Sequence, residues 1–175
     1  KIANTASDLI DCEKLILPGV GSFDYAMELL NASGLRDELE KQVLMNRKPI
    51  MGVCVGLQML AKSSDEGTLS GLGWIDGHVK VFDPINMPYK ISLPHMGWNN
   101  IFQVKESKIL AGVDREARFY FLHSYYFSCN NTEDIISVSE YGAKFTSAIN
   151  RDNIYGVQFH PEKSHGYGIK LLNNF

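Results

Sequence analysis

The segment at residues 52–56, Gly-Val-Cys-Val-Gly, places a cysteine between two glycines where one hydrophobic pattern gives way to another. Residues 49–53 form a short apolar run bounded by proline and glycine, which is typical of a buried strand. The apolar residues at 55–60 then fit one face of a helix. A reactive residue on such a tight strand-to-helix turn is the arrangement called a nucleophile elbow. The pattern therefore predicts Cys54 as a nucleophile, with a buried structural cysteine as the alternative.

The predicted elbow also indicates how the thiol is activated. A cysteine that precedes a helix faces its partially positive N-terminus, which favours the thiolate and lowers the thiol pKa from about 8.5. The flanking Gly52 and Gly56 permit a backbone turn that a Cβ atom would obstruct. We therefore expect a lowered pKa at Cys54.

Composition narrows the class of protein. The chain has 175 residues, of which 45% are hydrophobic and 21% charged, with a formal net charge of -3, as in one ordinary globular domain. A negative net charge without a basic run argues against a nucleic-acid partner. No apolar stretch reaches the length of a membrane span and no signal peptide is visible at Lys1, so no membrane partner is expected.

The cysteines favour a reduced compartment. Cys12, Cys54 and Cys129 are odd in number and widely spaced, which suits the cytoplasm better than a disulfide framework. The chain also lacks CxxC, HExxH and EF-hand patterns, so neither a metal nor another cofactor is expected.

The first third of the chain alternates strands and helices. A strand over 14–17 leads into the glycine-rich loop at 18–23, and Asp24 is expected to cap the helix that follows. A second helix is expected from Leu35 to about Asn46, before the strand that leads to Cys54. This order predicts parallel strands and an α/β fold.

The later chain favours antiparallel pairing. Asp76-Gly77 is a hairpin signal, residues 118–127 read as one aromatic strand, and the turn at 150–153 predicts another hairpin. Residues 166–175 look helical. We therefore expect one domain over residues 1–175, with a mixed, mostly parallel sheet flanked by helices.

A second chemical motif lies at residues 158–162, Gln-Phe-His-Pro-Glu. Residues two apart in an extended chain point to the same side, so His160 and Glu162 are expected to face one way. A carboxylate beside an imidazole orients the ring and supports its protonated form. Because this pair also follows a strand, it predicts a Cys54-His160-Glu162 nucleophilic triad.

The other histidines lack this companion. His78, His95, His123 and His165 have no carboxylate two residues away in an extended segment. His123, in the aromatic strand, is expected to be a packed or hydrogen-bonding residue, and His78 is expected to be solvated.

Taken together, PGVGSF, GVCVGLQ, PHMGWN, FLHSYYF and YGVQFHPEKSHGYG occur in the order found in one known family. The chain resembles the class I (triad) glutamine amidotransferases over essentially its whole length. Within that family it is similar to the HisH-type glutaminase subunits of imidazole glycerol phosphate synthase. The resemblance implies a flavodoxin-like fold and no cofactor.

The resemblance assigns roles to further residues. It implies that Cys54 attacks the side-chain amide of L-glutamine, with His160 as general base and acid and Glu162 as its orienting partner. It implies an oxyanion hole from the Val55 N–H and from Val20 or Gly21 after a peptide rearrangement. The residues that it implies hold the ends of glutamine are Gly52, Gln58, Glu66, Ser124 and Tyr125.

The resemblance also implies a partner. Released ammonia would protonate in water, so such glutaminases pass it to a synthase partner, here a HisF-like TIM-barrel cyclase in a heterodimer. Residues 94–99 are a candidate docking face, with an ordinary loop as the alternative. The family's first strand and helix, with a Gly-Asn turn, do not appear before the segment at 14–21. We therefore expect this sequence to be an N-terminally shortened form.

Other function classes have less support from the residues. A stand-alone cysteine hydrolase, such as a peptidase or γ-glutamyl hydrolase, would share the elbow but need not share Gln58, PHMGWN or HSYY. A non-catalytic binding module would be expected to have lost part of the triad. A glutaminase that feeds a surface-polysaccharide sugar amidotransferase would retain all of these features.

Overall fold

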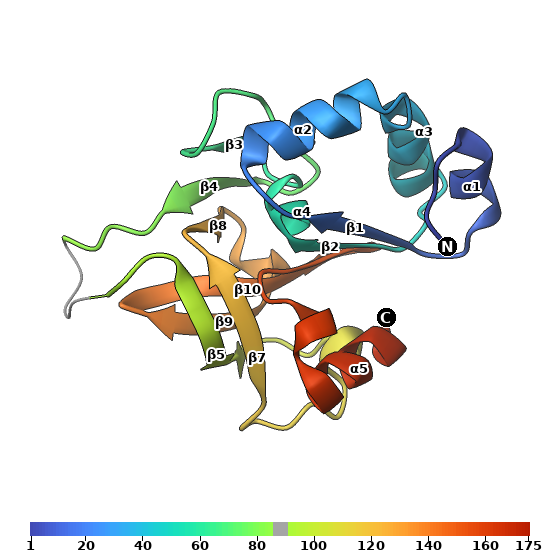
Figure 1. Ribbon diagram of the computed structural model, residues 1–175. Coiled ribbons are helices and arrows are strands. Elements are labelled where there is room, and N and C mark those ends of the chain that lie inside the picture. Colours follow the sequence, from blue (N-terminus) through green and yellow to red (C-terminus); the bar gives the residue numbers. More distant parts are fainter. Residues whose placement is uncertain (86–90) are drawn as a thin grey trace.

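The computed structural model describes residues 1–85 and 91–175 (Figure 1). The helices are α1 (Ala6–Asp11), α2 (Phe23–Ala32), α3 (Arg36–Glu40), α4 (Val55–Gln58) and α5 (His165–Asn174). A π-helical turn, Lys41–Met45, continues α3. The strands are β1 (Leu15–Gly19), β2 (Ile50–Cys54), β3 (Ser63–Ser64), β4 (Gly77–Val81), β5 (His95–Asn100), β6 (Phe102–Gln103), β7 (Arg118–His123), β8 (Tyr125–Cys129), β9 (Ile135–Tyr141), β10 (Ala143–Arg151) and β11 (Ile154–Val157).

The main sheet has the strand order β1-β2-β11-β10-β9-β6 within the described residues. Strands β1, β2 and β11 are parallel, whereas β10, β9 and β6 continue the sheet in antiparallel fashion. The expected α/β fold with a mixed sheet is confirmed, but the sheet is less parallel than expected. Tight turns join β9 to β10 and β10 to β11. Because a tight turn reverses the chain direction, the strands that it joins are antiparallel.

Two smaller sheets differ from the sequence-based expectation. The predicted hairpin at Asp76-Gly77 is wrong, because β4 pairs with β8 and β3 while Trp74 and Ile75 are buried beside it. The predicted aromatic strand also divides at Ser124. Its first part, β7, pairs with β5, and its second part, β8, pairs with β4. Separate pairing partners on the two sides of Ser124 explain the break.

The N-terminus of α2 is capped by Ser22, whose hydroxyl accepts a hydrogen bond from the Tyr25 N–H. Asp24, the expected cap, instead accepts hydrogen bonds from the backbone N–H groups of Thr68 and Leu69 at 2.9 and 3.1 Å. Asp24 therefore ties the loop after β3 to α2, and this loop carries one of the candidate site residues.

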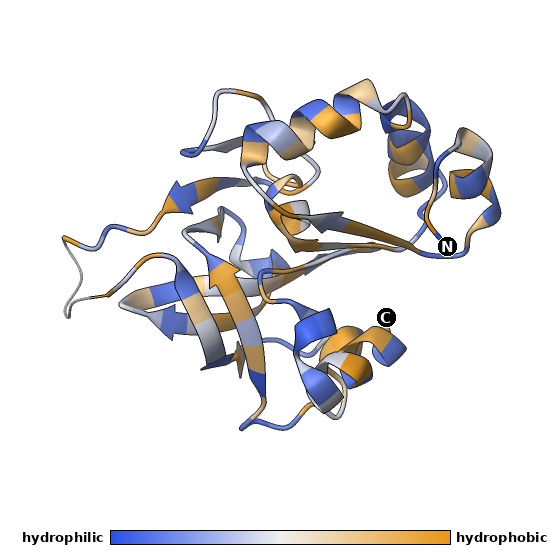
Figure 2. Cartoon of the chain, viewed as in Figure 1, coloured by the Kyte–Doolittle hydropathy of each residue, from blue (hydrophilic) through white to orange (hydrophobic). Residues whose placement is uncertain are grey.

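The core surrounds β2, whose five residues are all buried. Helices α2 and α3 lie on one side of β1 and β2, and α5 lies on the other (Figure 1). Hydropathy colouring shows β2 as largely hydrophobic (Figure 2). Such a continuous apolar run is typical of a strand covered on both faces. In the described part of the chain, none of the helices is long and apolar enough to span a membrane.

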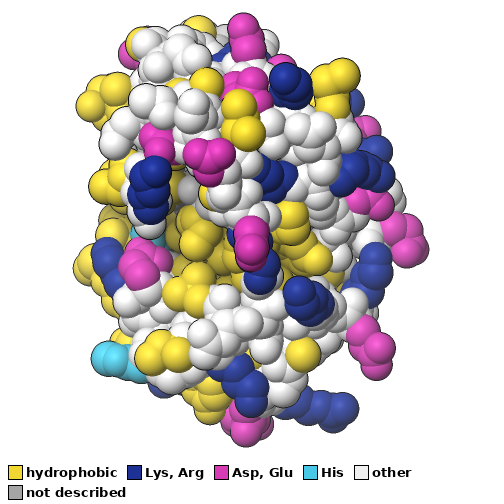
Figure 3. Space-filling view, turned by 90° about the vertical axis from the view of Figure 1, so that its right-hand side faces the viewer, with side chains coloured by type: hydrophobic (Ala, Val, Ile, Leu, Met, Phe, Trp, Pro, Cys, Tyr) yellow, Lys and Arg dark blue, Asp and Glu magenta, His cyan; other side chains and the backbone are white. Residues whose placement is uncertain are grey.

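An apolar groove of about 440 Å³ lies beside β1, which is at one end of the main sheet. Ile2, Leu15, Leu17, Leu30 and Leu35 contribute to its lining. Seen from this side, the molecule is hollowed, with hydrophobic side chains at the bottom of the hollow and charged ones around it (Figure 3).

Candidate active site

The candidate site lies where three parallel strands end. Register places Gly19 of β1 beside Cys54 of β2, and Val157 of β11 beside Val53. The chain therefore delivers the glycine-rich loop after β1, the cysteine after β2 and His160 after β11 to one edge of the sheet. Binding sites of α/β proteins commonly form at this carboxyl edge.

The elbow at Cys54 is a strained turn closed by glycines. Cys54 has φ 55° and ψ -113°, a conformation that side chains other than glycine seldom adopt. A Cβ atom at Gly56 would collide with the Leu17 carbonyl of β1, and one at Gly52 would lie 2.5 Å from the Gly56 oxygen. Gly52 thus lies beneath the turn, and its small size permits the close contact between strand and helix.

The elbow gives a first testable prediction. Gly56→Ala should lower the free energy of unfolding by about 1–3 kcal/mol, because the new methyl group must displace the backbone of β1. Chemical denaturation followed by circular dichroism measures this change. Gly166→Ala in α5 is the matched control, since a Cβ atom there meets nothing within 4 Å. Equal stability of Gly56→Ala and the unmodified chain would contradict the described packing.

The Cys54 thiol is buried and its contacts are weak. Its Sγ atom lies 3.7 Å from the Leu122 carbonyl oxygen and 3.8 Å from Gln158 Nε2. Burial raises the pKa of Cys54 to about 11, although the Val55 N–H acts in the opposite direction. The expected lowering of this pKa is therefore wrong: α4 has only four residues, and desolvation of the thiolate dominates. At neutral pH the thiol keeps its proton and requires a base to remove it.

His160, the predicted base, lines the same cavity as Cys54. Its ring is buried, and its Nδ1 lies 2.7 Å from Oε1 of Glu162, whose side chain is 55% exposed. The bond to Nδ1 leaves Nε2 as the ring atom that can accept a proton. The backbone N–H of His160 also donates to the Tyr120 carbonyl at 2.8 Å. This bond fixes the segment after β11 against β7.

A cavity of about 290 Å³ brings most of the predicted residues together. Glu162 lies behind His160 rather than in the cavity wall, and Gly52 supports the turn from below. The residues that line the cavity are Val20, Gly21, Cys54, Val55, Gln58, Glu66, Pro94, Leu122, His123, Ser124, Tyr125, His160 and Lys163. A cavity of this size lies at the small end of the range for ligand pockets, which suits a small molecule such as an amino acid.

Gln58 and Glu66 are both held by hydrogen bonds. Gln58 Nε2 donates to the Tyr125 carbonyl at 3.0 Å and to Gln158 Oε1 at 3.2 Å. Glu66 Oε2 accepts from the Phe23 N–H at 2.8 Å, at the N-terminus of α2. A helix N-terminus stabilises a carboxylate, so α2 helps to hold a negative charge in the cavity.

Sequence reasoning missed several residues of the site. Gln158 is buried and contacts both Cys54 and Gln58, and its place two residues before His160 on an extended chain was the available signal. Leu122 and Lys163 line the cavity without a comparable signal. His123 also lines the cavity and is buried and hydrogen-bonded, as expected for it.

A larger cleft, of about 550 Å³ beside β6, has different chemistry. Its lining mixes charged and apolar side chains and includes no cysteine or histidine. Residues 1–85 and 91–175 also contain no cluster of three His, Cys, Asp or Glu side chains able to hold a metal.

Comparison with known proteins bears on this arrangement. A sequence model described as glutamine amidotransferase class-I matches residues 3–175. The chain belongs to the class-I glutamine amidotransferase family. It is 50% identical to the imidazole glycerol phosphate synthase subunit HisH of Leptospira interrogans, over 100% of this chain and 86% of that protein. It is 51% identical to the protein of the same name from Bdellovibrio bacteriovorus, over 99% and 85%.

Solved structures agree on the class-I glutamine amidotransferase fold. A crystal structure described as glutamine amidotransferase has a TM-score of 0.73 at 17% identity, covering 99% of this chain and 85% of that one. A glutamine amidotransferase from Thermotoga maritima has a TM-score of 0.64 at 17% identity, covering 94% and 63%. The elbow, the cavity and the histidine of this site thus lie in a fold shared by amidotransferases.

Proposed function

We propose that this chain is a glutaminase subunit that hydrolyses L-glutamine and passes the ammonia to the synthase that makes imidazole glycerol phosphate in histidine biosynthesis. The observation that carries the proposal is the meeting of Cys54 and His160 in one amino-acid-sized cavity, with Glu162 bonded to the ring. About 50% identity to proteins named HisH supports the assignment to this synthase.

The first half of the reaction forms a thioester. His160 takes the Cys54 proton through Nε2 as the sulfur attacks the side-chain carbonyl carbon of glutamine. The carbon–nitrogen bond then breaks, and His160 returns the proton to the leaving nitrogen, so that ammonia departs. Glu162 keeps the imidazole in the required tautomer and stabilises its protonated form.

The second half releases glutamate. His160 takes a proton from water, the hydroxide attacks the thioester carbonyl, and the carbon–sulfur bond breaks. The proton returns to the Cys54 sulfur, so the enzyme is regenerated and one water molecule is consumed. A thiol with a pKa near 11 is a poor nucleophile at neutral pH, so the first half depends on the base. The second half depends on it because water must lose a proton as it attacks.

The proposed oxyanion hole has one fixed donor and one movable donor. We assign the fixed donor to the Val55 N–H, which follows the nucleophile at the start of α4. Val20 or Gly21 would supply the second N–H from the loop after β1. Val20 is 76% exposed and Gly21 has φ +89°, so this part of the cavity wall is little constrained by packing.

The polar groups of the cavity match the two ends of free glutamine. We assign the substrate ammonium to Glu66, which is the carboxylate of the cavity wall, and the carboxylate end to the backbone at Ser124 and Tyr125. Gln58 holds the Tyr125 carbonyl in place and so supports the Ser124-Tyr125 backbone. Gly52 contributes through the shape of the turn.

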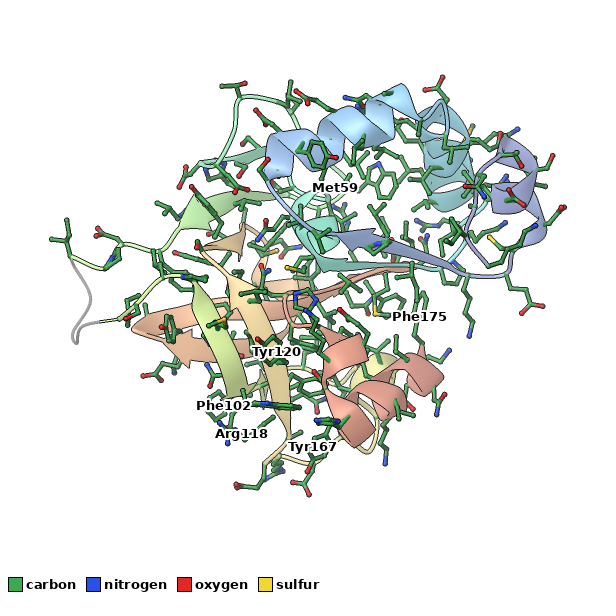
Figure 4. All side chains as sticks on the ribbon, viewed as in Figure 1. Met59, Phe102, Arg118, Tyr120, Tyr167 and Phe175 are labelled. Atoms are coloured by element: carbon green, nitrogen blue, oxygen red, sulfur yellow. The ribbon has the colours of Figure 1, made fainter. Side chains whose placement is uncertain are left out.

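A partner surface is proposed on the outer face of β5 and β7. Met96, Trp98 and Leu122 are 65%, 38% and 36% exposed, and Met96 lies opposite Leu122 in the strand register. Tyr120, labelled in Figure 4, extends this face and contacts the Trp98 ring at 6.1 Å between centroids. We propose that a HisF-like TIM-barrel cyclase binds this face and forms a heterodimer with this chain in the cytoplasm.

Partner dependence tests the assignment. The free chain should hydrolyse glutamine slowly, because the loop at Val20 and Gly21 completes the oxyanion hole only in the complex. Adding the HisF-like cyclase with its phosphoribosyl acceptor should raise glutamate release by at least about a hundredfold, the scale of one oxyanion donor. A coupled glutamate dehydrogenase assay measures this rate.

Two controls sharpen the test. Met96→Ala with Trp98→Ala should weaken cyclase binding, whereas Ile169→Ala, at an exposed position on α5, should not. Stimulation only by a sugar-modifying synthase of surface polysaccharide would move the assignment to that acceptor. A free chain as fast as the complex would remove the case for partner control.

A further inference from the structure

Two buried histidines beside the cavity have no part in the proposed reaction. His95 on β5 and His123 on β7 lie opposite each other in the strand register. His95 Nδ1 is 3.0 Å from His123 Nε2, and both residues are buried. A buried contact between two imidazoles requires one ring to donate and the other to accept.

The neighbours of this pair determine where each proton lies. His123 Nδ1 is 2.8 Å from the Tyr125 carbonyl oxygen, which can only accept, so this nitrogen carries a hydrogen. In the neutral ring His123 Nε2 is then an acceptor, and His95 Nδ1 is the donor to it. His95 Nε2 is left to accept from Asn99 Nδ2 at 3.3 Å.

The orientation of the Asn99 amide is itself fixed. Its Nδ2 donates to the Glu140 carbonyl at 2.9 Å, and its Oδ1 accepts from the Asn100 N–H at 2.8 Å. Turning the amide over would lose both bonds and leave His95 Nε2 without a donor. One order of hydrogen bonds therefore satisfies every member, from Asn99 through His95 and His123 to Tyr125.

Both rings stay neutral at the pH of a cell. Burial lowers the pKa of His123 to about 3, and the neighbouring His95 adds to the shift. Burial also lowers the pKa of His95 to about 4. The His95 ring stacks between Phe121 and Tyr141, at 4.9 and 4.1 Å between centroids, so packing holds it in this orientation.

The hydrogen-bond chain ends on the cavity wall. The Tyr125 carbonyl oxygen that accepts the hydrogen bond from His123 also accepts one from Gln58, which bonds to Gln158 near the Cys54 sulfur. At its other end the chain begins on β5, whose opposite face carries the exposed Met96 and Trp98. The same short network thus joins the outer strand to the proposed glutamine-binding backbone.

We propose that Asn99, His95 and His123 form a positioning relay that holds the Ser124-Tyr125 backbone in the geometry required to bind glutamine. The relay rests on the proposed function. Its members act through Tyr125 and Gln58, and they are positioning residues rather than catalytic ones. Such a role needs two specific tautomers, whereas simple core packing would be satisfied by any ring of similar shape.

The first test reads the tautomers directly and needs no activity. Long-range 1H–15N spectra of the imidazoles in the full chain should show hydrogen on Nδ1 of both His95 and His123, unchanged between pH 6 and 8. In His95→Asn, whose amide can donate from the Nδ1 position, the His123 ring should keep the same tautomer. Hydrogen on Nε2 of either ring in the unmodified protein would overturn the relay.

The second test measures glutamine affinity by calorimetry in the Cys54→Ala background, which prevents turnover. Adding His95→Phe retains the stacked ring but removes the donor to His123, and should weaken glutamine binding roughly tenfold. Adding His95→Asn should restore affinity to within about twofold. Asn99→Leu, at a half-buried position, should weaken binding by about threefold, and His165→Phe should leave the dissociation constant unchanged.

These outcomes separate the relay from the proposed function. Equal glutamine affinity in the His95→Phe and His95→Asn proteins would overturn the relay while leaving the glutaminase assignment intact. Failure of the Cys54→Ala protein itself to bind glutamine, with both tautomers as expected, would instead overturn the proposed function and the binding role of the relay with it.

Discussion

Replacing Cys54 with alanine should reduce glutamine hydrolysis by at least about a thousandfold, because the thioester cannot form without the sulfur. Cys54→Ser should be similarly inactive, since the hydroxyl is a weaker nucleophile than the thiol at this buried position. Glutamate release in the presence of the cyclase and its acceptor measures the loss. The far-UV circular dichroism spectrum should be unchanged, because alanine fills a site where the thiol makes only weak contacts.

The other two cysteines are the controls for this experiment. Cys12 and Cys129 are free, half-buried thiols outside the cavity. Cys12→Ala and Cys129→Ala should therefore retain full turnover. Normal turnover in Cys54→Ala would show that another group is the nucleophile, and the assignment of the whole cavity would have to be abandoned.

Substitution of His160 should be nearly as damaging as loss of the nucleophile. With the thiol pKa near 11, few molecules carry a thiolate at neutral pH, so His160→Ala should lower kcat by at least about a thousandfold. Raising the pH toward 11 should partly restore the rate, since hydroxide then replaces the base. The pH dependence of glutamate release in His160→Ala measures this recovery.

Glu162 should have a smaller effect. Its side chain is about half exposed, so Glu162→Gln should keep a hydrogen bond to His160 Nδ1 and cost only about tenfold in kcat. Lys163→Gln, at the next position, is a poor control because Lys163 lines the cavity; Lys170→Gln on α5 is preferable. A Glu162→Ala protein with unchanged kcat would show that another group orients the histidine.

Local patterns in the sequence predicted the parts of the site that local geometry builds. The turn around Cys54 is determined by Gly52 and Gly56, and the His160–Glu162 contact follows from their spacing of two residues. Both could be recognised without knowledge of the rest of the fold. The parallel part of the sheet was also accessible, because the alternation of strands and helices in the first third of the chain indicates parallel pairing.

Features that depend on distant residues were missed. The pKa of Cys54 is set by burial under β7, which a glycine-rich motif does not encode. His78, expected to be solvated, is half-buried, with Nδ1 2.8 Å from Ser63 Oγ and Nε2 2.6 Å from Asp65 Oδ1. Ser63 and Asp65 both lie in the segment after α4, for which the sequence predicted no strand pairing.

One missed element had a recognisable signal. Helix α1 lies in a segment where no helix was predicted, yet Thr5 and Asp8 form a capping box at its start. The Thr5 side chain accepts from the Asp8 N–H, and the Asp8 carboxylate accepts from the Thr5 N–H. The usual form of this motif has Glu or Gln at the last position, so the shorter Asp concealed it.

The side chains of β5 alternate between two faces, and substitutions on these two faces have different consequences during evolution. Met96 and Trp98 are exposed on one face, while His95 on the other face is buried against Phe121 and Tyr141. Outward residues can be exchanged as the chain acquires a new synthase, without disturbing the hydrogen-bond order on the inner face. A lineage of such glutaminases could therefore change the enzyme it supplies with ammonia while keeping its own chemistry constant.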